Sequence, residues 1–426
     1  MVNVAKAKRI TKEKSRSFSS GYLPVMLLVI FGQVMRVSLL IRKRNAQAFA
    51  AIDPTNAITI LLVGLGALVL LTPRGNRVLR HLFVSPLRFF MIYFMFCGLS
   101  VLWSDDVAFT VFRTVQIVVN TVLMCWIMAE IGNLPDALLA LIRFSAVWLI
   151  FGMLGKTRIA GAALFVNDNA SACVAAMGFV MTIGAWKERI IASQKLALPA
   201  VVFIGGLVSC LSSASNISAI LGSALVFAGV RNKNALLVQG LAGILVIVIG
   251  WSVSQSGVLN KWLMPGKTQQ QIATLHGRTD MWKRYYKGIR ERPVIGYGFP
   301  VGEKKARKLE DGTVFGTSSA HNSIIGVAIN TGVVGLVLVF LGSLHILLAT
   351  NASMIAGRQG GITIVSVLAT AFLNSMSYPV VGSHWFWPTT VVMGIAGIGV
   401  CFVWRKKTER GRLLNRRRMQ SRKVEA

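Results

Sequence analysis

Apolar runs of about 20 residues recur along the whole chain, and they restrict its fold more than any other feature. An α-helix needs a run of about that length to cross the hydrocarbon core of a bilayer. Hydrophobic residues make up 54% of the chain and charged residues only 14%, which excludes an ordinary soluble domain. We therefore predict an all-α, polytopic membrane protein of about twelve transmembrane helices. The expected spans are 22–41, 55–72, 87–103, 107–129, 136–154, 168–186, 196–212, 216–230, 235–252, 321–348, 362–378 and 385–404.

Lys and Arg residues outside these runs predict the orientation. The tails 1–21 and 405–426 are basic, and basic segments beside spans tend to remain in the cytoplasm, so both termini are expected there. With nine spans in 22–252 and three in 321–404, the segment 253–320 becomes a large, partly helical loop outside the membrane. The net charge of +31 is then explained by tails attracted to anionic lipid, and nucleic acid is not expected as a partner.

The outer loop holds the largest set of ionisable groups. Between 254 and 320 there are twelve Lys or Arg against five acidic residues, which favours an anionic partner. Arg binds phosphate oxygens through paired hydrogen bonds, and His accepts protons near neutral pH. Arg278 and His321 are the candidates for these two roles, binding a lipid-linked phosphate and activating a hydroxyl group. The alternatives stay open that Arg278 anchors in lipid headgroups and that His321 only starts a helix.

A short amphipathic helix is expected within this loop. Met281, Trp282, Tyr285 and Ile289 have helical spacing, and Pro293 would end the helix. The opposite face is basic, so we expect the aromatic stripe to contact the membrane interface rather than a sugar.

The next helix is expected to begin near the end of the loop. Ser318 or Ser319 would cap it and place His321 and Asn322 in its first turn, where free backbone N–H groups suit an anion. All five cysteines lie in apolar runs, so neither a disulfide framework nor a metal cluster is expected, and no cofactor.

Four groups of residues follow one another in a characteristic order. They are Trp103-Ser104-Asp105-Asp106 with Arg113; Arg158, Gly161 and Asn167-Asp168-Asn169; Gly277-Arg278 with Trp282, Pro293, Gly296 and Gly298; and Ala320-His321-Asn322 with Gly326, Gly332 and Gly335. This order resembles the O-antigen ligase and polymerase superfamily, particularly its exopolysaccharide polymerases. The resemblance extends over roughly 85–404.

The resemblance implies a GT-C-like, metal-independent glycosyltransferase of the bacterial inner membrane. Such enzymes take a glycan from undecaprenyl pyrophosphate at the periplasmic face and transfer it to an acceptor. Carried over by position, Arg278 would bind the pyrophosphate, and His321 would activate the acceptor hydroxyl or hold the phosphate. The residues expected to bind substrate are Arg158, Asn167, Asn169, Asn216, Trp282 and Asn322. Chain-length regulators and export proteins are possible partners.

One position departs from the family pattern. Members usually carry Arg or Lys where this chain has Asn216, in the stretch 211–217. Loss of one charge-assisted hydrogen bond typically costs a few kcal/mol at a buried site. Lys156, Arg158 or another cation would have to replace that charge, or the donor is held differently.

Four functions remain open at this stage. Polymerisation of lipid-linked repeat units is preferred by analogy, and ligation of a finished chain to a lipid A core uses the same donor chemistry. A transporter or flippase would also have about twelve spans, but few ionisable groups lie within these runs, namely Arg36, Arg113 and Arg143. Asn216 gives some weight to a non-catalytic scaffold of an export complex.

Overall fold

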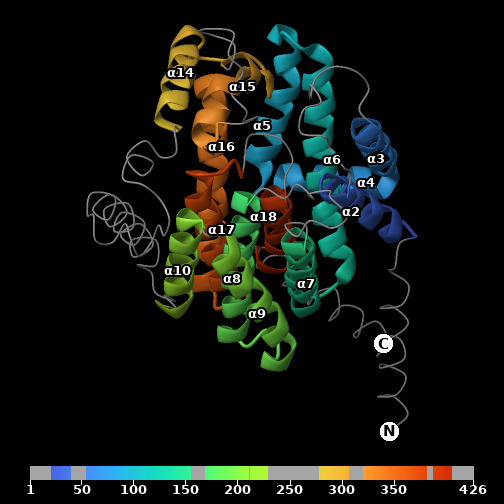
Figure 1. The fold of residues 1–426 in the computed structure, drawn as a ribbon. Helices are drawn as coiled ribbons and strands as arrows, with labels where there is room; N and C mark the ends of the chain where they lie inside the picture. Colours follow the sequence, from blue (N-terminus) through green and yellow to red (C-terminus); the bar gives the residue numbers. More distant parts are fainter. Residues whose placement is uncertain are drawn as a thin grey trace, which may run out of the picture.

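A computed structural model describes residues 21–39, 54–154, 168–210, 212–228, 278–306, 320–380 and 387–404 (Figure 1). Every regular element in these ranges is a helix, so the predicted all-α class is confirmed for them. The helices are α2 (Leu23–Leu39), α3 (Pro54–Leu70), α4 (Pro73–Val84), α5 (Arg88–Leu99), η1 (Ser100–Trp103), α6 (Val107–Ile131), α7 (Leu134–Leu154), α8 (Asp168–Lys187), α9 (Ser193–Cys210), α10 (Ser213–Ala228), α14 (Arg278–Glu291), α15 (Val301–Ala306), α16 (Ser323–Ile355), α17 (Gly361–Ser375), α18 (Trp387–Ile398) and η2 (Gly399–Val403).

Several helices have the dimensions of membrane spans. By length and composition, 5 of the described helices qualify, namely α6, α7, α8, α9 and α16, and up to 6 do if α3 and α4 form one bent span. Shorter apolar helices lie at most of the other expected spans, and 235–252 is outside the described residues. The protein is thus a multi-pass membrane protein, and the number of twelve crossings stays a prediction.

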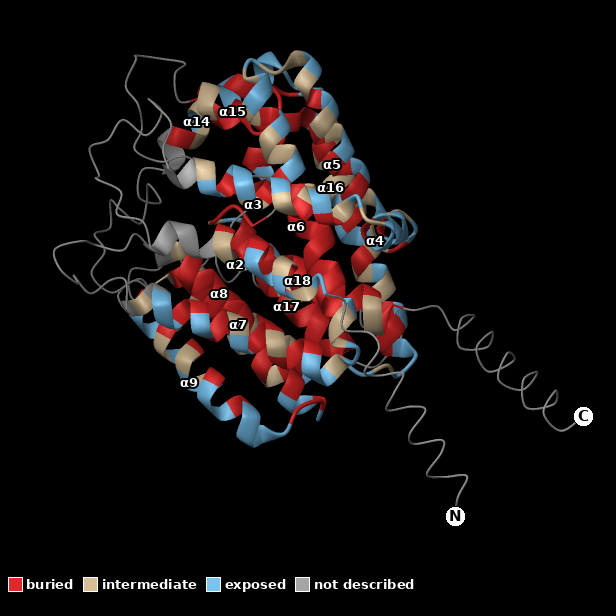
Figure 2. Cartoon of the chain, turned by 90° about the vertical axis from the view of Figure 1, so that its right-hand side faces the viewer, coloured by how far each residue is buried: buried red, intermediate tan, exposed pale blue. Residues whose placement is uncertain are grey.

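Helix α8 forms the centre of the bundle and lies against α7, α9, α10 and α17. Buried residues dominate it, as Figure 2 shows, because its sequence is rich in Ala, Gly and Ser. Small residues let helix backbones approach closely in a membrane, where the hydrophobic effect does not drive helices together. At Gly178, for example, an added Cβ would lie 2.3 Å from the ring of Phe203 in α9.

Helix α4 was not expected, because its sequence is too short and too polar for a span. It follows α3 after a bend of 87° and begins with Thr72, whose hydroxyl accepts a hydrogen bond from the Gly75 N–H at 3.2 Å. Its arginines are exposed, whereas Leu82 packs in the core. Residues 73–84, which lie outside the predicted spans, therefore form an amphipathic helix on the bundle surface.

A buried polar network joins α2 to α6. The Gln33 amide donates to Asn120 Oδ1 at 2.8 Å and accepts from the Nδ2 of Asn120 and the Nε2 of Gln116, both at 2.9 Å. Arg113 donates in turn to Gln116 Oε1 at 2.9 Å. Because a membrane interior offers no water to these groups, each must find its partner within the protein, on its own helix or on a neighbouring one.

Candidate active site

The site is built around a break in α16. Gly332 interrupts this helix with φ 62° and ψ −160°, a conformation that side chains other than glycine rarely adopt. The segment after α14 pairs with the main-chain groups on either side of this break. Val333 N–H donates to Pro293 O at 2.8 Å, and Gly298 N–H donates to Asn330 O at 2.9 Å. The polar groups released by the break are thereby paired again, as they must be within a membrane protein.

Helices α14 and α15 lie over one end of α16 (Figure 1). The predicted amphipathic helix is confirmed, but the prediction that its apolar stripe contacts the membrane is wrong. Met281 and Tyr285 are buried in a small core whose members come from α14, α15 and the start of α16. That core comprises Met281, Tyr285, Tyr297, Ala306, Ala320, Ile325 and Ile329. An apolar face fits lipid and protein equally well, and here the protein covers it.

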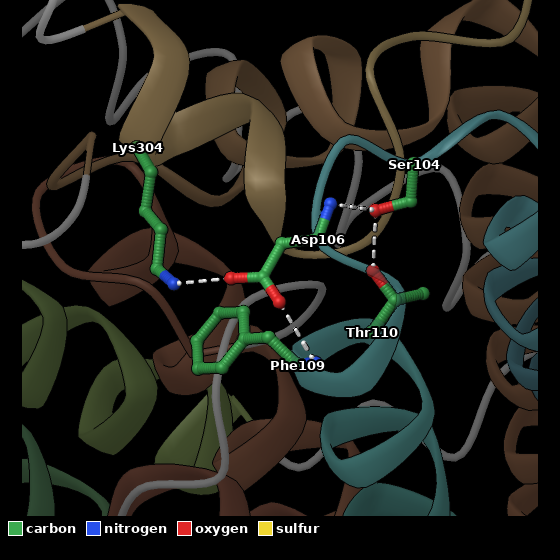
Figure 3. Close-up of polar contacts among 5 residues, drawn as sticks. All are labelled: Ser104, Asp106, Phe109, Thr110 and Lys304. Atoms are coloured by element: carbon green, nitrogen blue, oxygen red, sulfur yellow. Dashed lines mark hydrogen bonds and ion pairs between the residues drawn. The ribbon is translucent and has the colours of Figure 1, made fainter.

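The turn formed by Ser104, Asp105 and Asp106 packs against α15, about 200 residues away in the sequence. The Lys304 ammonium lies 3.1 Å from Asp106 Oδ2 and 3.5 Å from the centre of the Phe109 ring, as Figure 3 shows. Lys305 bonds to Asp105 Oδ2 at 2.6 Å in a more exposed pair. The motif residues Asp105 and Asp106 are therefore in contact with the segment that follows Gly296 and Gly298 of the later motif.

Two side chains in this region, Asp105 and Tyr297, have shifted pKa values. The hydrogen bond from Lys305 and its charge, helped by Arg292, lower the pKa of Asp105 below its ordinary value. Partial burial, followed by the hydrogen bond to Glu291, raises the pKa of Tyr297 to about 12. Asp105 is therefore charged and Tyr297 neutral at physiological pH.

His321 lies in a tightly held turn before α16. Its φ is 50°, in the left-handed region, which costs a residue other than glycine about 1–3 kcal/mol. The preceding carbonyl, of Ala320, accepts a hydrogen bond from the Trp282 indole N–H at 2.9 Å. The His321 ring faces that of Tyr378, with ring centres 6.4 Å apart.

Asn322 is the N-cap of α16, so the expected cap at Ser318 or Ser319 is wrong. Its Oδ1 accepts hydrogen bonds from the N–H groups of Ile324 and Ile325 at 2.9 and 3.2 Å. Its Nδ2 donates to Met376 O at 3.2 Å, which ties the turn to the end of α17. His321 therefore lies just before the helix, and not in its first turn.

Glu303 is a carboxylate that the sequence did not single out. Only 1% of its surface is exposed, and its Oε1 accepts from Ala320 N–H at 3.4 Å. Its own N–H donates to Asn330 Oδ1 at 3.2 Å. No sequence signal distinguishes it, because an acid beside Lys304 and Lys305 usually belongs to a solvated face.

A second polar cluster lies where α10 meets α17. Ser215 Oγ donates to Asn374 Oδ1 at 2.7 Å, and Asn374 Nδ2 donates to Ser218 Oγ at 2.5 Å. Next to it, the Oδ1 of Asn216 is buried and accepts no hydrogen bond from the described residues. Since Asn374 is two residues before Met376, the helix end that contacts Asn322 also reaches the helix of Asn216.

The remaining predicted site residues are placed only in part. Asn169 is half-buried in the first turn of α8, and Arg278 is the first residue of α14, with its side chain outside the described atoms. Arg158 and Asn167 lie outside the described residues. Within the part of the chain that is described, no group of three or more His, Cys, Asp or Glu could hold a metal ion.

The fold and the site define a helical multi-pass membrane protein in which α14 and α15 lie over the broken helix α16. Residues 198–340 match the family model for O-antigen ligase, which confirms the resemblance to the O-antigen ligase and polymerase superfamily. No curated protein matches the chain. Five of the eight predicted site residues lie in the matched segment, namely Asn216, Arg278, Trp282, His321 and Asn322.

Proposed function

We propose that this protein is a glycosyltransferase that polymerises undecaprenyl-pyrophosphate-linked oligosaccharide repeat units at the periplasmic face of the bacterial inner membrane. The observation that carries the proposal is the strained turn at His321, which lies inside the segment matched to O-antigen ligases. Non-glycine residues in this conformation cluster at functional sites, because the surrounding structure must compensate for their cost.

The reaction requires a base and a group that stabilises the leaving pyrophosphate. The oxygen of the acceptor hydroxyl attacks the anomeric carbon of the donor glycan, and His321 takes the hydroxyl proton. The bond between that carbon and the pyrophosphate oxygen breaks, and the pyrophosphate leaves with the electron pair. Arg278 binds the leaving group through charge-assisted hydrogen bonds. The leaving group is already ionised, so the family resemblance implies that no metal is needed.

We place the substrate groups beside the start of α16, which contacts α14 and the end of α17; α10, the helix of Asn216, packs against α17. Asn216 supplies a buried oxygen with no described hydrogen-bond donor, which suits a sugar hydroxyl better than a phosphate. With Asn169 in the first turn of α8, and Arg158 and Asn167 expected on the loop before it, this arrangement gives a site with fewer positive charges than the family pattern.

Purified protein in lipid nanodiscs, incubated with a defined undecaprenyl-pyrophosphate oligosaccharide, should give a ladder of longer products. His321→Ala and Arg278→Ala should abolish the ladder. Matched controls are His345→Ala, a histidine further along α16 that packs edge-on against Phe89, and Arg290→Ala in the last turn of α14. Activity of His321→Ala at the wild-type rate would refute the proposed role of the imidazole.

Ligation is the second candidate, because the matched family is described as O-antigen ligase. The two activities differ only in the acceptor, so the same assay distinguishes them. A polymerase extends a second lipid-linked unit, whereas a ligase consumes the donor only when a lipid A core acceptor is added.

A flippase is distinguished in cells. Loss of Arg278 or His321 should leave lipid-linked units on the periplasmic leaflet if the protein is the transferase. Accumulation of the units on the cytoplasmic leaflet would favour a transporter instead.

A further inference from the structure

The turn that presents His321 is fixed at its two ends by different elements. On the C-terminal side, Asn322 caps α16 and contacts the end of α17. On the N-terminal side lies Ala320, which is completely buried. A left-handed residue persists only where its neighbours are held, so the groups that hold Ala320 control the position of the imidazole.

Trp282 makes the shorter of the two hydrogen bonds to Ala320. Its indole N–H lies 2.9 Å from the Ala320 carbonyl oxygen, and its ring packs against the small core under α14. The Glu303 carboxylate accepts the Ala320 N–H at the longer distance of 3.4 Å. Both main-chain polar groups of Ala320 are therefore bonded to side chains, one from α14 and one from α15.

Trp282 also follows Arg278 by four residues in α14. Residues with this spacing lie on the same face of a helix, one turn apart. The indole thus connects the helix that carries Arg278 to the turn that carries His321. Any displacement of α14 would move the two groups relative to each other unless this hydrogen bond is kept.

We infer that Trp282 is a positioning residue that keeps the His321 imidazole in place relative to Arg278, and that Glu303 supports the same residue, Ala320. This inference rests on the proposed function, and it replaces the expectation that Trp282 binds substrate. The two roles make opposite predictions for Phe at this position, because Phe keeps an aromatic ring for a sugar but has no N–H donor.

The test is steady-state kinetics of Trp282→Phe in the nanodisc assay, with donor concentration varied. We expect kcat to fall by about tenfold or more, since a misplaced catalytic group can cost up to about 100-fold, while KM for the donor stays unchanged. Trp103→Phe is the matched control, because the Trp103 indole N–H has no hydrogen-bond partner among the described residues. It should keep kcat within about twofold of wild type.

A pair of substitutions at Glu303 tests the supporting contact. Glu303→Gln keeps an oxygen that can accept the Ala320 N–H and should retain most of kcat, whereas Glu303→Ala should lower kcat without changing KM. Size-exclusion profiles and helical circular dichroism check that each variant is folded.

The outcomes separate this inference from the proposed function. An active His321→Ala variant would remove the proposed function and the inference together. If His321→Ala is inactive but Trp282→Phe behaves like Trp103→Phe, or changes KM alone, only the positioning role is overturned. Equal loss of kcat in Glu303→Gln and Glu303→Ala would remove the role of the carboxylate oxygen as an acceptor.

Discussion

Replacement of Asn322 separates a structural role from a role in binding substrate. In Asn322→Ala, the N–H groups of Ile324 and Ile325 lose their capping oxygen, and the Met376 carbonyl loses its donor. Loss of an Asn cap costs about 0.5–2 kcal/mol, and one hydrogen bond contributes about 0.5–1.5 kcal/mol. We therefore expect the free energy of unfolding to fall by about 1–3 kcal/mol.

Two further variants separate the contribution of the N-cap from that of the hydrogen bond to Met376. Asn322→Ser keeps a capping oxygen and Asn322→Asp keeps the same oxygen with a charge that favours a helix N-terminus, but neither has the amide donor to Met376. Both should recover most of the cap contribution. Equilibrium unfolding in mixed micelles of sodium dodecyl sulfate and a mild detergent gives the free energies, and the nanodisc assay gives the rates.

This reasoning is refuted if the free energy of unfolding does not depend on the capping oxygen of residue 322. If Asn322→Ala unfolds like wild type, the capping bonds contribute nothing measurable. If Asn322→Ser is as stable as wild type but raises KM for the donor severalfold, the amide contacts substrate and the role expected from the family resemblance is correct.

Three other predictions concern elements that support the site. Glu188→Ala should cost about 3–5 kcal/mol, because the carboxylate accepts three hydrogen bonds at the start of α17 and is buried, and Glu188→Gln should cost less in the same unfolding assay. Gln33→Leu should cost about 1–2 kcal/mol, because it breaks the network with Asn120 between α2 and α6; an unchanged stability would mean that these groups find other partners. Since Lys305 lowers the pKa of Asp105, the stabilisation from this pair is complete above the ordinary aspartate pKa and is lost as pH falls through the lowered value. The difference in melting temperature between wild type and Asp105→Asn should therefore stay constant from neutral pH to about pH 4 and close below it, and a difference that closes near pH 6 would contradict the assignment.

Apolar run length was enough to predict the long apolar helices of the described chain. It could not predict which partner covers an apolar face. Met281 and Tyr285 have the spacing of an interfacial helix, but lipid and protein attract such a stripe equally, and only the tertiary fold places them in a small core. Helix α4 escaped prediction for the opposite reason, since its arginines conceal an apolar side that includes Leu82.

Candidate site residues could be named from the sequence where a residue type carries its chemistry with it. His321 and Asn322 could be singled out as candidates, and their turn is held at both ends. The N-cap was predicted at the wrong residue because serine and asparagine have similar capping tendencies. The sequence alone therefore could not separate Ser318 and Ser319 from Asn322. The left-handed conformation of His321 and the burial of Glu303 arise from contacts with distant segments, and no local pattern encodes them.

The break at Gly332 has a consequence for how this protein can vary among its relatives. The stretch 293–298 and the interrupted helix are joined through main-chain atoms, at Pro293 with Val333 and at Gly298 with Asn330. Main-chain hydrogen bonds do not depend on most side chains, so exposed residues of α14 and α15 can change without separating these helices from α16. The exposed face of this region can therefore diverge residue by residue while the helix beneath it stays the same.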